Sequence, residues 1–202
     1  MKPIVSTTEL EELKLKVDTS PLKIGGANFK TNVLLEVSSS KLVYKPSHGV
    51  AIFCFSFLAV GLGVLFFSIL PIIKGSTQIM GTQWFLILFG LLFTGAGVFM
   101  FYNFYKPRVF DKQLGFYYKS YKLDPNQKSK NNKNKPIRLK SIKAIQIIGE
   151  HVSNDKGSFK SFELNLVLED GTRRNVVDHG NLKAIIRDAE RLSEFLNIPI
   201  WH

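Results

Sequence analysis

The fold of this chain is decided by residues 50–73, VAIFCFSFLAVGLGVLFFSILPII, in which 24 successive positions hold no Asp, Glu, Lys, Arg or His. A second stretch of 22 residues, 84–105, WFLILFGLLFTGAGVFMFYNFY, shares this property. At about 1.5 Å per residue, the two stretches form helices of about 36 and 33 Å, and a hydrocarbon core is about 30 Å thick. The sequence therefore predicts a transmembrane helical hairpin.

Two other kinds of segment, a buried helical hairpin and a signal peptide, can also be this apolar. A buried helical hairpin in a soluble protein would need more surrounding chain than these 202 residues provide, and soluble helices rarely run this long without a polar face. A cleavable signal peptide fits less well, because the first apolar run follows an acidic segment and lacks a small-residue cleavage pattern. We therefore expect an integral membrane protein.

Small residues within the two spans suggest that they pack against each other. Ala59 and Gly63 stand four residues apart, as do Gly90 and Thr94, and the run 95–97 is Gly-Ala-Gly. Small side chains at this spacing let helix backbones approach closely in lipid. A dimer interface is a weaker alternative, and the absence of ionisable residues inside the spans argues against an ion pathway built from this chain alone.

Orientation follows from the distribution of Lys and Arg near the span ends. The connecting loop, 74–83, holds one basic residue. The flanking segments hold Lys41 and Lys45 before the first span and Lys106, Arg108, Lys112, Lys119 and Lys122 after the second. Both termini are thus expected on the cytoplasmic side of a membrane, the bacterial inner membrane by preference.

The segment after the hairpin, 106–202, has the pattern of a strand-rich domain. A strand, a turn at 111–115 and a second strand are predicted within 106–119, and the isoleucine-rich stretch 137–152 predicts one or two more. In 161–168 the residues Phe162, Leu164, Leu166 and Leu168 alternate with polar ones, which is typical of a half-buried strand. Asp170-Gly171 then predicts a type I′ turn into a strand at 173–177.

The period changes to that of a helix after the last strand. Apolar residues recur at helical spacing over 182–196, with Asn181 as the expected N-cap and Asn197 and Pro199 at the end. In the N-terminal segment, 1–49, we expect a strand at 12–17 and a hairpin of 33–37 with 41–44. The predicted fold class is an α+β membrane protein, in which the helical hairpin is inserted into one small strand-rich cytoplasmic domain closed by a C-terminal amphipathic helix.

The strand pair 162–177 and the helix 182–196, joined to two membrane helices, resemble bacterial membrane proteins with a pleckstrin-homology-like domain. The segments 21–29, PLKIGGANF, and 176–181, VVDHGN, are similar to signature stretches of an uncharacterised bacterial family of this kind. The resemblance implies an adaptor or complex-associated role and names no ligand.

Formal charge is +11, and nine basic residues against one acid gather between Lys119 and Lys143. The centre of this stretch, 124–136, reads as a solvated loop. Contact with anionic lipid headgroups is the functional alternative, since each lysine near such a surface contributes about 1 kcal/mol. The candidate lipid contacts are Lys128, Lys130, Lys133, Lys135, Arg138 and Lys140. Nucleic-acid binding is not expected, because no recognised motif accompanies the basic residues.

No catalytic motif is found, so we do not expect an enzyme. The four histidines are far apart in sequence, and nucleophile elbows, phosphate loops and C-x-x-C sites are missing. The lone Cys54 is expected to pack as a small apolar group. Asp178-His179 is the one pair of interest, and a turn cap before the last helix is the expected role. No catalytic residue, metal ligand, cofactor or small-molecule substrate is predicted.

Two function classes remain. The first is a membrane-tethered adaptor or assembly subunit that binds a protein partner at the cytoplasmic membrane face. The second is an accessory subunit of a transporter or channel complex, which packs through its helical hairpin.

Overall fold

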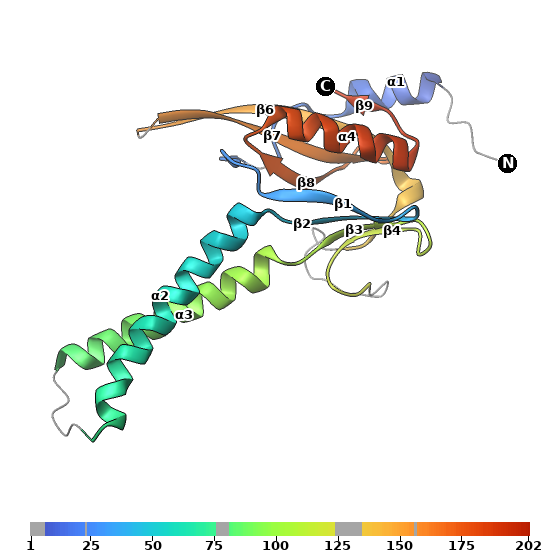
Figure 1. The fold of residues 1–202 in the computed structure, drawn as a ribbon. Coiled ribbons are helices and arrows are strands. Elements are labelled where there is room, and N and C mark those ends of the chain that lie inside the picture. Colours follow the sequence, from blue (N-terminus) through green and yellow to red (C-terminus); the bar gives the residue numbers. More distant parts are fainter. Residues whose placement is uncertain (1–6, 23, 76–80, 124–134, 156) are drawn as a thin grey trace. The chain divides into compact units, whose positions relative to one another are not determined.

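Figure 1 shows a computed structural model of the chain, in which residues 7–22, 24–75, 81–123, 135–155 and 157–202 are described. Within those ranges the fold is α+β, with four α-helices and two sheets. The chain divides into two compact units, of which one is Pro46–Lys106 and the other combines Met1–Lys45 with Pro107–His202. We call them the helical unit and the strand-rich unit.

The helical unit holds α2 (His48–Ile73) and α3 (Gly81–Phe104), two helices long and apolar enough to cross a membrane. The hydroxyl of Ser47 caps the start of α2 by accepting a hydrogen bond from the Val50 N–H at 3.4 Å. Only 17% and 11% of the most apolar windows of α2 and α3 are buried. Among the described residues, most of their apolar surface is therefore exposed, unlike that of a core helix in a soluble protein. Of the predicted loop, residues 76–80 lie outside the described residues.

The two helices pack directly on each other, as expected, through glycines. A Cβ atom added to Gly61 would lie 2.9 Å from Cα of Thr94, and one added to Gly97 would lie 2.9 Å from the backbone N of Leu58. Real Cβ atoms do not approach other atoms this closely, so side chains at these two positions would force the helices apart. The buried Cys54 packs within α2, as the sequence predicts.

The prediction of which small residues form this contact is partly wrong. Gly90 and Gly97 face α2, but Gly63 and Gly95 have no neighbouring atom within 4 Å of an added Cβ, and Ala59 is exposed. The contact on α2 is instead made at Gly61. Four-residue spacing alone does not reveal which side of a helix meets its neighbour, because both sides of α2 carry small residues.

The strand-rich unit contains two sheets. The first has the order β1-β2-β3-β4-β5 and comprises β1 (Asn32–Ser38), β2 (Lys41–Pro46), β3 (Arg108–Asp111), β4 (Phe116–Lys119) and β5 (Ile137–Arg138). The second has the order β8-β7-β6-β9 and comprises β6 (Ile142–Asn154), β7 (Gly157–Leu168), β8 (Arg173–His179) and β9 (Ile200–Trp201). The 3₁₀ turn η2 (Leu139–Ser141) joins β5 to β6.

The first sheet is continuous across the inserted helices. Strand β2, which precedes α2, pairs antiparallel with β3, which follows α3, and the register places Lys41 opposite Asp111 and Tyr44 opposite Arg108. The chain therefore leaves the sheet and returns to it at neighbouring strands. The hairpins predicted at 33–44 and 106–119 are both present.

Turn chemistry explains the ends of these strands. The Asp111 carboxylate accepts hydrogen bonds from the backbone N–H groups of Gln113 and Leu114, both at 3.0 Å, and pairs with Lys41 at 3.1 Å. The turn between β7 and β8 is not type I′, because only Gly171 has a positive φ, at 78°. The Gly171 N–H donates to the carbonyl of Leu168, which gives the three-residue loop in which a left-handed glycine follows a type I turn.

Helix α4 (Leu182–Leu196) begins and ends as predicted. The Asn181 side chain accepts from the Ala184 N–H at 3.1 Å, and Asn197 takes the left-handed conformation at φ 57°. The main core lies between the two sheets and the apolar face of α4, and its fully buried side chains include Tyr44, Phe110, Ile145, Leu164, Leu166, Ile185 and Leu192. Strand β9 was not predicted, and its two residues pair parallel with β6.

The predicted strand at 12–17 is wrong, because α1 (Thr7–Lys16) occupies this region. The alternation of leucine and lysine there suggests a strand. However, Leu10, Leu13 and Val17 recur at helical spacing and pack on Ala144, Val167 and Trp201, while Leu15 is 87% exposed. Burial of one helical face on the second sheet outweighs the local alternation.

Candidate functional site

The face of the second sheet that points away from the main core is polar and yet buried. On β7, Ser161, Glu163 and Asn165 each have 0% of their surface exposed. The sequence predicts these positions as the solvent side of a half-buried strand, and this prediction is wrong. The other side of β7 is as predicted, since Phe162, Leu164, Leu166 and Leu168 join the main core.

The cover over this polar face is the segment between α1 and β1, residues 18–22 and 24–31, which we call the strap. Backbone N–H groups of the strap donate to side chains of the sheet. The Leu22 N–H donates to Oε2 of Glu163 at 2.9 Å, and the Ala27 N–H donates to Oγ of Ser161 at 2.9 Å. The Gly25 N–H donates to the Glu150 carboxylate at 3.1 Å. The sheet thus binds the strap chiefly through the backbone.

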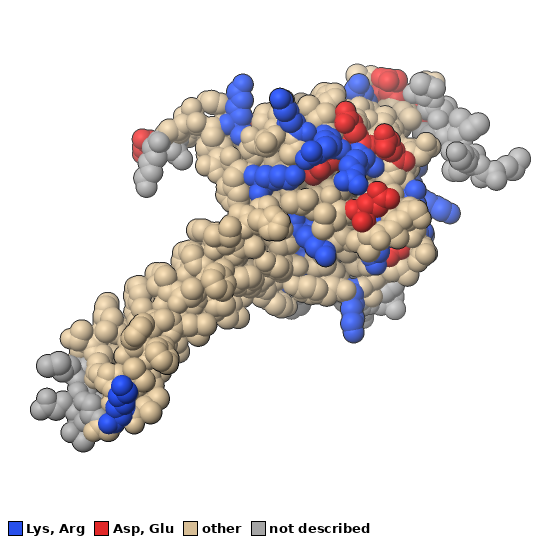
Figure 2. All heavy atoms as spheres, viewed as in Figure 1, with Lys and Arg blue, Asp and Glu red and all other residues tan. Residues whose placement is uncertain are grey.

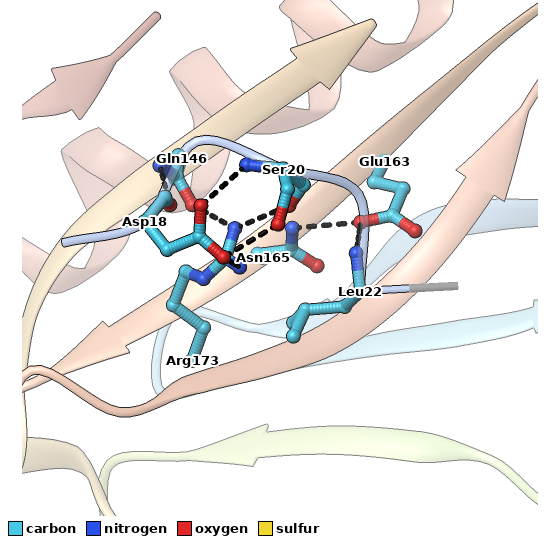
Figure 3. A network of polar contacts seen from close by, with 7 residues as sticks. All are labelled: Asp18, Ser20, Leu22, Gln146, Glu163, Asn165 and Arg173. Carbon is cyan, nitrogen blue, oxygen red and sulfur yellow. Dashed lines mark hydrogen bonds and ion pairs between the residues drawn. The ribbon is translucent and has the colours of Figure 1, made fainter. Parts of the chain in front are cut away.

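The start of the strap is held by Gln146 and Arg173 (Figure 3). The Gln146 amide donates to the carbonyl of Asp18 at 3.1 Å, and the Arg173 guanidinium donates to the carbonyl of Ser20 at 2.7 Å. A second guanidinium nitrogen lies 3.0 Å from the Asp18 carboxylate. Hydrogen bonds from Ser20, together with the charge of Arg173, lower the pKa of Asp18.

The end of the strap joins the edge of β8. The Thr31 N–H donates to Nδ1 of His179 at 3.2 Å, and its hydroxyl donates to the carbonyl of Asp178 at 2.8 Å. Lys30 and His179 form an antiparallel bridge. The pair Asp178-His179 thus lies at the end of strand β8, and its predicted role as a turn cap is wrong.

Polar side chains of the sheet are also linked to one another beneath the strap. The Asn165 amide donates to Oε2 of Glu163 at 3.0 Å, and the Asn175 amide donates to Asn165 at 3.2 Å and to Asp178 at 2.7 Å. Glu163 therefore receives N–H donors from the strap and from the sheet. This network is what makes a buried carboxylate tolerable, because each donor replaces lost water.

The large side chains of the strap point away from the sheet. Leu22, Ile24 and Phe29 are 43%, 93% and 53% exposed. A close approach at Gly26 contrasts with this, because an added Cβ there would lie 2.6 Å from Cβ of Ser161. The strap therefore fits the sheet by its backbone and by one glycine, with its apolar side chains left in solvent.

A second polar cluster lies inside the main core. Nε2 of His179 is 3.9 Å from Oδ2 of Asp188, outside hydrogen-bond range, and Tyr44 is adjacent to the same carboxylate. Burial raises the pKa of Tyr44 well above its usual value, and the negative charge of Asp188 raises it further. These side chains are at most 3% exposed, so a substrate cannot reach them in this conformation.

The candidate lipid contacts are only partly described. Lys128, Lys130 and Lys133 lie outside the described residues. All three of Lys135, Arg138 and Lys140 are exposed; Lys135 lies shortly before β5, Arg138 ends β5 and Lys140 lies in η2. In Figure 2 basic side chains lie on the strand-rich unit, and the length of the helical unit shows none until its loop end.

In the described part of the chain, no group of three or more His, Cys, Asp or Glu side chains is placed to hold a metal ion. Comparisons with known protein families, with curated proteins and with solved structures find no match to this chain.

Proposed function

We propose that this protein is a membrane-tethered adaptor or assembly subunit, which binds a protein partner at the cytoplasmic face without catalysing a reaction. In this proposal α2 and α3 cross the membrane as a hairpin, in a bacterial inner membrane. The strand-rich unit lies in the cytoplasm with both termini.

The single observation that supports this proposal most is the insertion of two charge-free helices into one sheet. Because Tyr44 pairs with Arg108, both ends of the helical unit are tied to neighbouring strands. A hairpin that crosses twice returns the chain to its starting side, which this pairing requires. One crossing, or three, would separate β2 from β3.

The side of the membrane is assigned from charge. Basic residues flank the hairpin where it joins the strand-rich unit, and the connecting loop has only Lys74. Cytoplasmic segments near membrane spans are enriched in Lys and Arg, which favours a cytoplasmic strand-rich unit. The proposal also draws on the resemblance of 162–177 and 182–196 to pleckstrin-homology-like membrane proteins, which implies an adaptor role.

A role as accessory subunit of a transporter or channel complex is the second candidate. It is favoured by the small residues Gly63 and Gly95, which do not face the partner helix. Small residues on a lipid-exposed helix face allow a further membrane helix to pack closely. In that case the hairpin, and not the strand-rich unit, makes the essential contact.

Photocrosslinking in living cells separates the two candidates. A photoreactive phenylalanine analogue at Ile24 or Phe29 samples the strand-rich unit, and one at Phe66 or Phe67 samples the lipid-facing side of α2. The adaptor role predicts a discrete protein adduct from the first pair. Adducts from the second pair alone would indicate the accessory role, and lipid adducts alone would contradict both.

Contact with anionic lipid is a further part of the proposal. Exposed Lys135, Arg138 and Lys140 each contribute about 1 kcal/mol near a charged surface. In nanodiscs with anionic lipid, amide exchange in η2 and the adjoining strand ends is expected to be slower than in neutral nanodiscs. Replacing the three side chains by Gln should remove the difference, and a difference that persists would reject the contact.

A further inference from the structure

The polar face beneath the strap has the composition of a surface that is at times exposed. A face that is permanently covered gains stability from apolar residues, as the same face does near α1, where Ala144 and Val167 are buried. Beside them, Ser161, Glu163 and Asn165 are equally buried but polar. Burying such groups is unfavourable unless each is hydrogen-bonded, whereas exposing them to water costs little.

The strap is bound mainly through its backbone, along a course that turns at Ile24 and Gly25 and bends at Ser20, Leu22 and Asn28. Its hydrogen bonds with the sheet use mainly backbone groups, such as the N–H groups of Leu22 and Ala27 and the carbonyl of Ser20. Its apolar side chains face solvent. Backbone donors and acceptors are common to all polypeptides, so a bound segment is selected more by its ability to follow this course than by its side chains.

Two close contacts between the strap and the rest of the strand-rich unit restrict the occupant. The close approach to Ser161 requires glycine at position 26. Gly180 restricts the other end, because an added Cβ there would lie 2.8 Å from Cα of Asn28, and its N–H donates to the carbonyl of Phe29 at 3.2 Å. An occupant must therefore follow the same turn, with a glycine opposite Ser161 and, directly before it, a residue that adopts the positive φ of 82° seen at Gly25.

The strap is attached at both ends, and between them it is held by hydrogen bonds and by the close fit of Gly26. Val17, before it, is buried with α1, and Asn32, after it, begins β1. Between these two points Leu22, Ile24 and Phe29 are 43%, 93% and 53% exposed, so the contacts of the strap with the sheet are mainly polar. Local opening of the strap has a low free energy compared with unfolding of the core.

We infer that the polar face of β6, β7 and β8 is a docking surface for a segment of a partner polypeptide that contains two adjacent glycines, and that the strap is its intramolecular occupant. The partner segment displaces residues 18–22 and 24–31 and takes over their hydrogen bonds to Glu150, Ser161 and Glu163. The tethered strap competes with the partner and lowers its apparent affinity. This inference rests on the proposed adaptor role, for which it names the binding surface.

A peptide with the sequence of residues 17–31 is the probe, with the full-length protein in detergent micelles. Gly26→Val prevents the strap from seating and leaves the sheet residues unchanged. It should raise affinity for the labelled peptide at least about tenfold over wild type, because the competing segment is removed. Ile24→Ala, at a 93% exposed position, is the matched strap control and should leave affinity unchanged.

Two further changes test whether the peptide uses the same contacts. In the Gly26→Val protein, Glu150→Ala removes the acceptor for the Gly25 N–H and should weaken peptide binding about tenfold. A peptide with Val in place of Gly26 should not bind any variant. Equal binding of the two peptides, or no gain from Gly26→Val in a folded protein, would overturn the inference.

Amide hydrogen exchange of the wild-type protein tests the inference without any substitution. The amides of Leu22, Ala27 and Thr31 should exchange at least about 100-fold faster than those of the buried residues of β6, because the strap opens locally. Exchange of both sets at one common rate would overturn the inference. Neither measurement depends on membrane insertion, so failure of the membrane proposal is distinguishable from failure of this one.

Discussion

Replacing Gly61 by Val should separate α2 from α3. An added Cβ would lie 2.9 Å from Cα of Thr94, against 3.4–4 Å for an ordinary contact, and the atom it meets belongs to the backbone and cannot rotate away. Relief requires movement of a whole helix. Overpacking of this kind costs about 1–3 kcal/mol, which corresponds to a roughly 5- to 150-fold smaller equilibrium constant for hairpin closure.

Gly63→Val is the matched control, because Gly63 lies on the same helix and has no atom within 4 Å of an added Cβ. Both variants change helix propensity alike, so propensity cancels in the comparison. Pyrene groups are attached at Phe66→Cys and Leu88→Cys, two exposed positions on opposite helices, in a Cys54→Ser background. Excimer fluorescence then reports helix contact during titration with SDS.

The expected result is an earlier SDS midpoint for Gly61→Val and an unchanged midpoint for Gly63→Val. Equal shifts for the two variants would show that the effect comes from the valine itself and would refute the packing assigned to Gly61. An unchanged midpoint for Gly61→Val would refute it as well.

Three predictions concern the strand-rich unit. Leu13→Asp should destabilise the docking of α1 by about 2–3 kcal/mol, whereas Leu15→Asp, at an 87% exposed position, should have no effect; thermal unfolding measures both. Asn181→Ala should cost about 1 kcal/mol through loss of the α4 N-cap, measured by urea unfolding. Burial alone would raise the pKa of Asp111, but hydrogen bonds from Leu114 and Lys41 prevail and lower it. The stability that Asp111 contributes is therefore present above the unfolded-state pKa of about 3.9 and is lost as pH falls through the lower folded-state pKa. Asp111→Ala should destabilise more at pH 7 than at acidic pH, and the difference should shrink as pH falls through the folded-state pKa.

The strongest periodic signals in the sequence predict the corresponding elements well. The bounds of the last helix agree, since its apolar stripe, its Asn181 cap and the left-handed Asn197 are all local features. The first apolar helix starts at His48, two residues before the predicted start at Val50. The predicted span contains only residues without ionisable side chains, and it therefore leaves out the histidine in the first turn of the helix.

Predictions failed where tertiary contacts decide. The alternation in 12–17 predicts a strand, but the second sheet offers an apolar face that only the helical arrangement of Leu10, Leu13 and Val17 covers. Strand β9 has two residues, too few for a periodic pattern. The turn type at Asp170-Gly171 depends on loop length, which the Asp-Gly pair does not specify.

The candidate site was missed because alternation in β7 has two explanations. Polar residues at 161, 163 and 165 fit a solvent-facing side, and they fit equally well a side covered by a backbone that needs hydrogen-bond partners. The resemblance of segment 21–29 to a family signature does not indicate that this segment covers the sheet. Its Gly25-Gly26 pair was the available signal, because adjacent glycines permit a close backbone approach to another element.

The central claim is that the two apolar helices cross a membrane and return to the side on which the strand-rich unit lies. It is tested most directly by single cysteines in a Cys54→Ser background, labelled in intact cells by a reagent that cannot cross membranes. A cysteine at Ser76, in the connecting loop, should be labelled in intact cells. A cysteine at Ser39, in the exposed turn between β1 and β2, should be labelled only after lysis. Labelling of Ser39 in intact cells, or of Ser76 only after lysis, would contradict the account.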